Sequence, residues 1–285
     1  MSAPGSHTFA TSGPVSLRLQ LHAADVSITT WDEPATEVEV EAPSPELAAE
    51  VVVRARESSG GRTEIVVQEP KRHRRFGRDS ELRFRIRAPH GADVDSTSGS
   101  SDLTAEGELG ALQVKTGSGD VSVAGVRGVS KVTSASGDIS ILDAEAALTV
   151  QTASGDVRVG RAAGALVVNA VSGDVSVRTA RAGVVLTTVS GDAEVGALTA
   201  GDARIQSVSG DIELGVASGL GVWIDAQSVS GTMTCELDVE DEPASDGTPS
   251  AELRVRTVSG DVRFVGGVAP ADACMPPWVT FRTGP

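Results

Sequence analysis

The sequence predicts an all-β fold, a single-stranded parallel β-solenoid (β-helix) with 18-residue coils. Three observations predict it. A Ser-Gly-Asp triplet recurs at a nearly constant interval, apolar and polar residues alternate on both sides of it, and aromatic residues make up only 3% of the chain. A unit this short cannot bury its apolar face alone, whereas stacked units share one narrow core of small aliphatic side chains.

The triplet itself predicts a turn. It stands at residues 118–120, 136–138, 154–156, 172–174, 190–192, 209–211 and 259–261, with a variant at 230–232 and a degenerate copy at 100–102. Successive glycines lie 18 residues apart four times, and then 19, 21 and 29 residues apart. Glycine tolerates a positive φ, and Asp and Ser side chains hydrogen-bond to backbone groups of a turn. A turn that is repeated in every coil explains this recurrence without catalysis.

The residues around the triplet predict two strands in each coil. Apolar residues alternate after the aspartate, at Val121/Val123, Ile139/Ile141, Val157/Val159, Val175/Val177 and Ile212/Leu214. They alternate before it at Leu112/Val114, Leu148/Val150, Leu166/Val168 and Val184/Leu186, and a short third apolar segment follows. Alternation with a period of two indicates half-buried strands, so each coil supplies one strand to each of two or three sheets. The coil is expected to be right-handed. A globular β-sandwich is the alternative, but it does not require a fixed interval.

Three regions follow from this pattern. Residues 1–95 are expected to form irregular N-terminal coils and a cap, with strands in TEVEVEA, TEIVVQE and LRFRIRA and a small helical insertion at about 45–56. Ser44 is its expected N-cap, followed by Pro45 and Glu46. Residues 96–265 are the regular solenoid, interrupted by an acidic loop at 239–250, and residues 266–285 are a C-terminal cap or tail.

The triplet aspartates are the first candidate site. Stacking places them in a column about 4.8 Å apart, where neighbouring charges repel by roughly 1 kcal/mol in a water-like medium. Turn N–H groups, protonation or bound cations must offset this repulsion. The chain lacks the double-glycine nonapeptide of calcium repeats, so we predict no metal site. The column stays a candidate for binding cations or a partner: Asp120, Asp138, Asp156, Asp174, Asp192 and Asp211.

Catalytic residues are not expected. A nucleophilic serine needs a general base, and the four histidines, at 7, 22, 73 and 90, all lie outside the regular repeats. A polysaccharide-active β-helix enzyme is the alternative, since an acidic column contains pairs of carboxylates. Sugar sites use aromatic platforms, however, and residues 100–264 hold only Trp223 and Phe264. We therefore predict a protein that is not an enzyme and has no cofactor.

Charge limits the partners. The net charge of −15 argues against nucleic acid, because phosphates would be repelled. Five basic residues, namely Lys71, Arg72, Arg74, Arg75 and Arg78, are candidate contacts with an anion or a partner, including the acidic column of another copy. No apolar stretch approaches the roughly 20 residues that span a bilayer, and no signal peptide is visible. We expect a cytoplasmic location.

The repeated SVSGDV and TVSGDV units, preceded by LRFRIRAPHGADVDSTSGSSDL, resemble the bacterial "putative adhesin" family of β-strand-repeat proteins, a domain of unknown function. The resemblance covers roughly residues 15 to 265. It implies a β-helix and no known catalytic residues. The sequence thus predicts a non-catalytic, adhesin-like scaffold or interaction module that binds a protein partner or itself.

Overall fold

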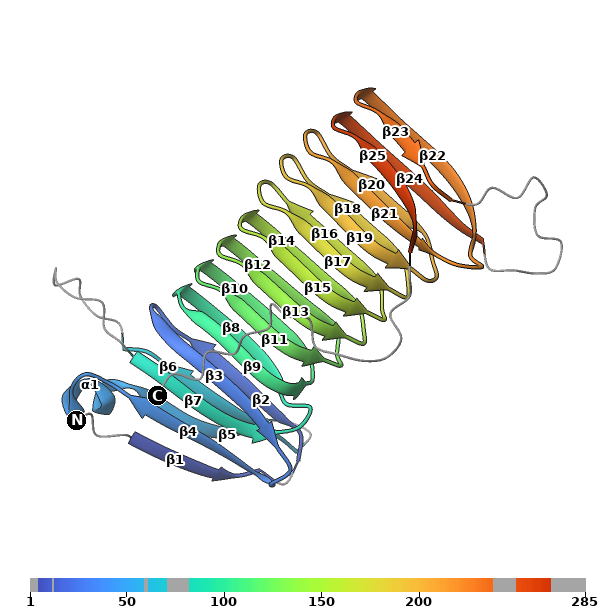
Figure 1. Cartoon of the computed structure of the whole chain (residues 1–285). Coiled ribbons are helices and arrows are strands. Elements are labelled where there is room, and N and C mark those ends of the chain that lie inside the picture. Colours follow the sequence, from blue (N-terminus) through green and yellow to red (C-terminus); the bar gives the residue numbers. More distant parts are fainter. Residues whose placement is uncertain (1–4, 12, 59–60, 71–81, 238–249, 268–285) are drawn as a thin grey trace, which may run out of the picture.

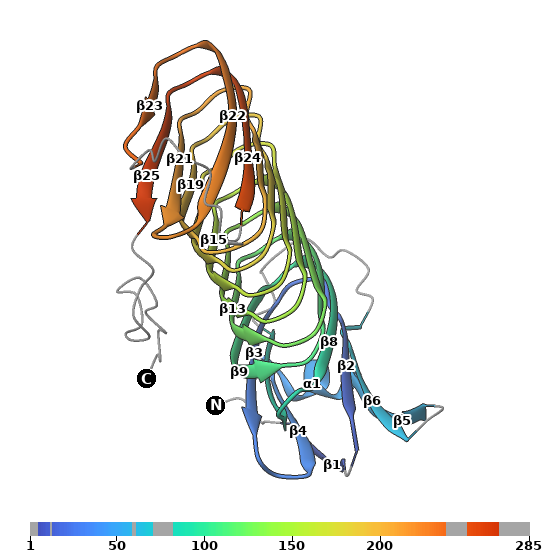
Figure 2. The ribbon, with the colours of Figure 1, turned by 90° about the vertical axis from the view of Figure 1, so that its right-hand side faces the viewer.

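The protein is an elongated stack of β-coils (Figure 1). A computed structural model describes residues 5–11, 13–58, 61–70, 82–237 and 250–267. The described strands form two sheets of 13 and 12 strands. Figure 2 shows the sheets as two facing walls, with the 13-stranded sheet on the left and the 12-stranded sheet on the right. The all-β, predominantly parallel solenoid is confirmed.

The 13-stranded sheet contains the strands that follow each triplet. In stack order these are β9 (Asp102–Leu109), β11 (Val121–Val126), β13 (Ile139–Ala144), β15 (Val157–Ala162), β17 (Val175–Ala180), β19 (Ala193–Leu198), β21 (Ile212–Ala217), β25 (Val262–Gly267) and β23 (Met233–Cys235). Residues 18 apart pair along this sheet, as Val121 does with Ile139. The third apolar segment of each repeat ends the same strand, as Val126 ends β11, so a coil has two sheets and not three.

The 12-stranded sheet contains the strands that precede each triplet. In stack order these are β8 (Asp93–Ser100), β10 (Leu112–Ser118), β12 (Ser130–Ser136), β14 (Leu148–Ser154), β16 (Leu166–Ala170), β18 (Val184–Thr187), β20 (Ala203–Gln206), β24 (Ser250–Ser259) and β22 (Gly221–Ser230). The alternate residues of both sheets fill the space between them and are almost completely buried. Phe264 points into this core, as its place in the alternation predicts, and is 2% exposed.

The last two coils do not stack in chain order. Strands β24 and β25 lie between the β20/β21 coil and the β22/β23 coil, which is outermost (Figure 1). Phe264 accordingly pairs with Leu214 on one side and with Cys235 on the other. The sequence interval of 29 residues therefore spans an exchange of positions, which the spacing alone did not predict. The acidic loop expected at 239–250 lies almost entirely outside the described residues.

The N-terminal coils also depart from chain order. Strands β2 (Val15–Gln20) and β3 (Ala24–Trp31) pair in parallel with β8 and β9. Strands β6 (Arg62–Gln68) and β7 (Leu82–Pro89) form the next coil outward. Antiparallel strands then close the end: β4 (Ala35–Glu41) on β7, β1 (Gly5–Ala10) on β4, and β5 (Val52–Ser58) on β6.

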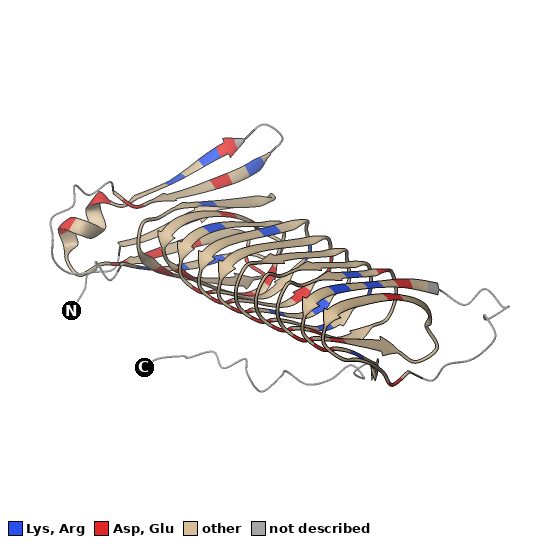
Figure 3. Cartoon of the chain, turned by 90° about the horizontal axis from the view of Figure 1, so that it is seen from above, with Lys and Arg blue, Asp and Glu red and all other residues tan. Residues whose placement is uncertain are grey.

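The predicted helix at 45–56 is wrong in length. Helix α1 covers only Pro45–Glu50, with the Ser44 hydroxyl accepting the Leu47 N–H at 3.3 Å as the expected N-cap. The following run begins with three valines, whose β-branched side chains favour a strand, and it pairs with β6. Figure 3 shows β5 and β6 as a charged ribbon that projects from the stack next to α1. The C-terminal cap predicted at 266–285 lies outside the described residues beyond Gly267.

Candidate functional site

The Ser-Gly-Asp turns form one continuous row along an edge of the stack (Figure 1). Each turn glycine has a positive φ and lies close to backbone of the neighbouring coil. Gly155 is an example. Its φ is +109°, and a Cβ on it would lie 2.3 Å from the carbonyl oxygen of Gly137 in the coil before. A side chain would therefore be strained and would also collide with backbone that belongs to another coil. Glycine at this position lets successive turns stack directly on one another.

The predicted aspartate column exists, and it is a hydrogen-bond ladder. The Oδ1 atom of each aspartate accepts the backbone N–H of the equivalent aspartate in the next coil. These N–H to Oδ1 distances are 2.9 Å from Asp120 to Asp102, 2.8 Å from Asp138 to Asp120, 2.9 Å from Asp156 to Asp138, 3.0 Å from Asp174 to Asp156, 2.9 Å from Asp192 to Asp174 and 2.8 Å from Asp211 to Asp192. The ladder continues from Asp261 to Asp211 at 2.8 Å and ends with the N–H of Thr232, which donates to Asp261 at 2.7 Å.

This ladder offsets the repulsion between the stacked carboxylates. A hydrogen bond from a backbone N–H to a carboxylate is charge-assisted, and it places a positive dipole end between successive carboxylates. Arg158 adds a second contribution in the middle of the column, because it contacts Asp156 at 2.7 Å and Asp138 at 3.8 Å.

Within the described ranges, no group of three or more His, Cys, Asp or Glu side chains could hold a metal ion. One oxygen of each carboxylate thus has a structural use.

A buried row of hydroxyls supports the same turns. Two residues before a triplet serine, a Thr or Ser hydroxyl donates to the carbonyl of that serine. The donor–acceptor distances are 3.2 Å for Thr116, 3.0 Å for Ser134, 2.9 Å for Thr152, 3.3 Å for Thr188 and 3.3 Å for Thr257. In the part of the chain that the structure covers, no triplet serine hydroxyl bonds to a histidine or a lysine. The turn thus lacks the activated nucleophile that acyl transfer needs.

A Thr-His-Asp arrangement that the sequence did not indicate lies at the N-terminal end. Thr30 Oγ1 and His90 Nδ1 are 2.9 Å apart, and His90 Nε2 is 3.5 Å from Asp32 Oδ1. The geometry argues against catalysis. Thr30 is 9% exposed and its hydroxyl oxygen already accepts the Glu108 N–H at 3.2 Å, while the Asp32 side chain is fully exposed and cannot hold the imidazole firmly. These contacts join β3 to the neighbouring coil.

A buried carboxylate accepts the backbone N–H groups of the turn that has no Ser-Gly-Asp triplet. Glu69, which is 5% exposed, accepts the backbone N–H groups of His22 at 2.5 Å and Ala23 at 3.1 Å. These residues form the turn between β2 and β3, which has no Ser-Gly-Asp. The sequence gives no local signal for this role, because Glu69 is 47 residues away from the turn that it closes.

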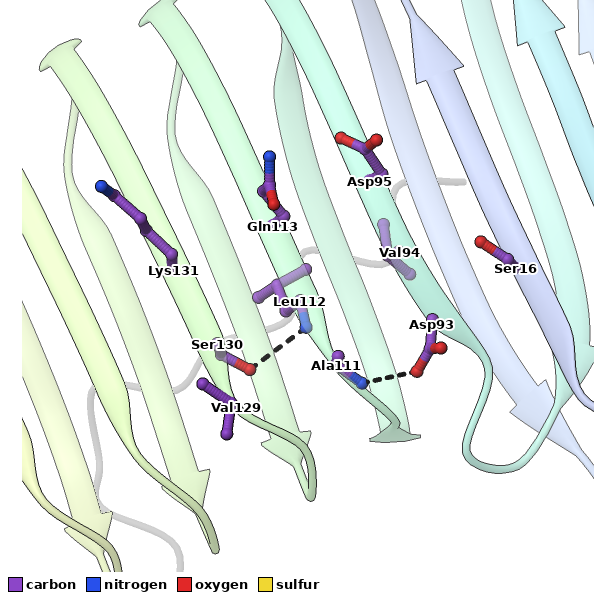
Figure 4. A pocket seen from close by; sticks show the side chains of 10 residues that line it. All are labelled: Ser16, Asp93, Val94, Asp95, Ala111, Leu112, Gln113, Val129, Ser130 and Lys131. Atoms are coloured by element: carbon purple, nitrogen blue, oxygen red, sulfur yellow. Dashed lines mark hydrogen bonds between the residues drawn. The ribbon is translucent and has the colours of Figure 1, made fainter.

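A depression of about 300 Å³ lies on the outer face of the 12-stranded sheet (Figure 4). Two of its polar side chains, Ser130 and Asp93, are engaged in the fold. The Ser130 hydroxyl oxygen accepts the Leu112 N–H at 3.1 Å and donates to the Gly128 carbonyl at 2.9 Å. Asp93 accepts the Ala111 N–H at 2.8 Å and pairs with Arg62. Figure 4 shows Lys131 and Asp95 at its rim, and no nucleophile and base face one another there.

The other candidates stand as follows. The basic residues Lys71, Arg72, Arg74, Arg75 and Arg78 lie outside the described residues, so their partner role stays a prediction. None of the described helices has the length and apolar character of a membrane span.

The chain is similar to several solved bacterial structures. One described as a "putative adhesin", from Parabacteroides distasonis, is 14% identical, with a TM-score of 0.45 over 92% of this chain and 97% of the other. A second "putative adhesin", from Bacteroides fragilis, is 14% identical with a TM-score of 0.38 over the same shares. A "putative lipid binding protein" from Parabacteroides distasonis is 13% identical, with a TM-score of 0.37 over 93% and 95%.

A search of curated proteins found no match. The family model described as Toastrack DUF4097 matches residues 15–264, which is most of the chain and includes every triplet. The stacked turns and paired sheets described above are what those residues build. The protein therefore belongs to the Toastrack DUF4097 family.

Proposed function

We propose that the protein is a non-catalytic, adhesin-like interaction module that presents the surface of a rigid solenoid to a protein partner. One observation carries the proposal. The glycines and the Oδ1 atoms of the repeat hold one coil on the next, and the buried hydroxyls hold the turn within each coil. What the repeat leaves free is a long, regular outer surface whose residues differ from coil to coil, which is the surface that repeat proteins use for binding.

The alternatives are less well supported. A polysaccharide-active site needs aromatic platforms, and Trp223, on the outermost strand, is the exposed aromatic residue of the described stack. Specific cation binding would compete for carboxylates that already accept backbone N–H groups. Two further expectations, a right-handed coil and a cytoplasmic location, stay predictions.

Photo-crosslinking in the native bacterium tests the proposal. A photoreactive amino acid is placed at one exposed or partly exposed position on each outer surface: Ser190 on the turn edge, Ser176 on the 13-stranded sheet and Thr187 on the 12-stranded sheet. We expect one surface to give a reproducible protein adduct and the other two to serve as controls. Absence of adducts from all three surfaces, or release of reducing ends when the purified protein meets polysaccharides, would contradict it.

A further inference from the structure

A row of exposed valines runs along the turn edge in one half of the stack. The residue before the triplet serine is Val171, Val189, Val208, Val258 and Val229 in five successive coils, and these side chains are 45% to 82% exposed. The following serines pair in the same order, which places the valines one above another. In the other half of the regular stack the same position holds Gly99, Gly117, Ala135 and Ala153. Only one half of the edge therefore presents an apolar row.

The triplet aspartates of the valine coils carry charges that no described basic side chain offsets. In the described residues, neither Lys nor Arg forms an ion pair with Asp174, Asp192, Asp211 or Asp261. In the small-residue half, Arg158 pairs with Asp156 and Asp138, while Asp102 and Asp120 have no ion pair among the described residues either. Glu194 and Glu213 lie just beyond the aspartates on the same edge, and Arg263 reaches Glu213 at 3.8 Å. An apolar row thus runs next to an acidic row along four coils.

Several backbone groups under the valine row already bond to neighbouring coils. The Ser190 N–H donates to the Val171 carbonyl at 2.9 Å, and the Ser209 N–H donates to the Val189 carbonyl at 3.0 Å. The exposed side chains are therefore the main contact that this edge offers a partner, which suits a helix, whose own backbone groups are already bonded. Five rows span about 19 Å at the strand spacing of about 4.8 Å. A helix of about 13 residues has that length, and its turns repeat every 5.4 Å, close to the spacing of the valines.

From these observations we infer that the valine row docks a basic amphipathic helix of a partner protein, with apolar side chains on the valines and Lys or Arg facing the aspartates. The inference rests on the proposed interaction function and assigns its surface. Charge complementarity chooses this occupant. A second copy would bring its own acidic row and a net charge of −15 to the same edge, which disfavours self-association there.

The test uses a labelled synthetic peptide of about 14 residues made of Leu on one helical face and Lys on the other. Peptides with Glu in place of Lys, and with Ala in place of Leu, are its controls. Binding to the full chain is followed by fluorescence anisotropy. We expect the Leu/Lys peptide to bind best. Replacing three valines of the row (Val189→Thr, Val208→Thr, Val258→Thr) should weaken its binding at least tenfold, and the same exchange at Val129 and Val185, exposed outside the row, should not.

Two more variants keep the test decisive if the Thr variant folds poorly. Asp192→Asn with Asp211→Asn keeps an oxygen for the ladder and removes two charges, so binding should weaken severalfold and lose much of its salt dependence. Ala135→Val with Ala153→Val lengthens the row and should strengthen binding. Equal binding of the Glu peptide, unchanged binding of these variants, or a dimer in sedimentation that the Thr exchange dissolves would overturn the inference. If crosslinks form from a sheet surface while these peptides fail, the proposed function stands and this surface alone is wrong.

Discussion

The regular stack and the N-terminal end solve the same problem, strand register, with different chemistry. In the stack, one aspartate per coil accepts the N–H of the next aspartate, and a glycine lets the turns approach. In the N-terminal end, antiparallel β4 and β7 are joined by exposed charge pairs: Arg87 with Glu37, Arg85 with Glu39 and Glu41, and Arg83 with Glu41. The stack thus repeats one backbone hydrogen bond in every coil, whereas the N-terminal end uses several different exposed ion pairs.

The difference follows from what each part must do. A coil inside the stack has a neighbour with the same backbone geometry on each side, so one turn geometry suits all coils, and a change in one coil affects two neighbours. The end coil has to stop the stack, and antiparallel strands replace there the parallel edge that another coil would join. The backbone ladder therefore recurs through the regular stack, whereas exposed side-chain pairs join the antiparallel strands β4 and β7.

The turn glycines give the largest expected effect. Gly155→Ala places a Cβ 2.3 Å from the Gly137 carbonyl oxygen at a φ of +109°, and we expect it to cost about 3 kcal/mol or more of unfolding free energy. Gly91→Ala is the matched control at the border of the N-terminal end. Its φ is +76°, but a Cβ there would meet nothing within 4 Å, so the cost should be about 1 kcal/mol. Urea denaturation of both variants measures the difference, and equal costs would mean that stacking contacts do not govern the turn.

The order of the last coils gives the next largest effect. Asp261 is the last triplet aspartate in the chain, but it is not the last member of the ladder. Its carboxylate accepts the N–H of Thr232, and Thr232 ends the ladder. Asp261→Ala should therefore cost as much as Asp192→Ala, about 1 kcal/mol for a hydrogen bond in a partly wet site. Thr232→Ala should cost less than about 0.5 kcal/mol, as surface changes usually do.

The opposite ranking would show that the coils stack in chain order. Asp261→Asn serves as the control, because an amide oxygen can still accept the N–H and one repulsive charge disappears. Its stability should match or exceed that of the unchanged protein at low salt. The order of the coils also explains why one triplet is Ser-Gly-Thr. With the observed order, the coil without a ladder carboxylate is the outermost one, where no further coil needs it.

The regular stack could be predicted from the sequence, and its ends could not, for a physical reason. A repeat reports its structure many times, so the turn at Gly155, the inward Val157 and the aspartate column could all be placed by spacing. Spacing left open whether N–H groups, protonation or cations offset the charges of the column, and the structure shows the N–H groups of the ladder. Contacts made once carry no such signal. Glu69 closes a turn far away in the chain, and the exchange of β24/β25 with β22/β23 leaves only an irregular interval in the sequence.

The helix shows a second kind of limit. The N-cap and first turn were recognisable from Ser44, Pro45 and Glu46, but the end was not, since no glycine or proline follows Glu50 directly. Tertiary pairing of β5 with β6 decides where the helix stops. The valine row was missed for the opposite reason. Its residues repeat with the triplet, and only their exposure in the structure separates them from core valines.

Charge pairs at the N-terminal end should have a small effect that salt removes. Arg85 contacts Glu41 at 2.5 Å and Glu39 at 3.8 Å, and its side chain is about half exposed. Arg85→Ala should cost about 0.5 kcal/mol at low ionic strength and nearly nothing in 1 M salt. Arg204→Ala, an exposed arginine of the stack with no ion pair among the described residues, is the control and should change neither value. A cost that persists in high salt would mean that Arg85 contributes by packing, and that the two regions differ less than their charges suggest.

The smallest effect concerns Glu46 in the first turn of α1. Its own backbone N–H and then the Ser44 hydroxyl hold the pKa of the exposed Glu46 carboxyl below its ordinary value. A depressed pKa in the folded state means that ionised Glu46 stabilises the helix start above the ordinary carboxyl pKa, and that this stabilisation is lost as the pH falls through the lowered value. NMR titration of the Glu46 side chain should show the shift, and Ser44→Ala should bring the pKa part of the way back. The stability difference between the unchanged protein and Glu46→Gln should be constant near neutral pH and shrink in acid. An ordinary pKa, or a difference that does not change with pH, would mean that the helix start is held by Leu47 packing in the core and not by its cap.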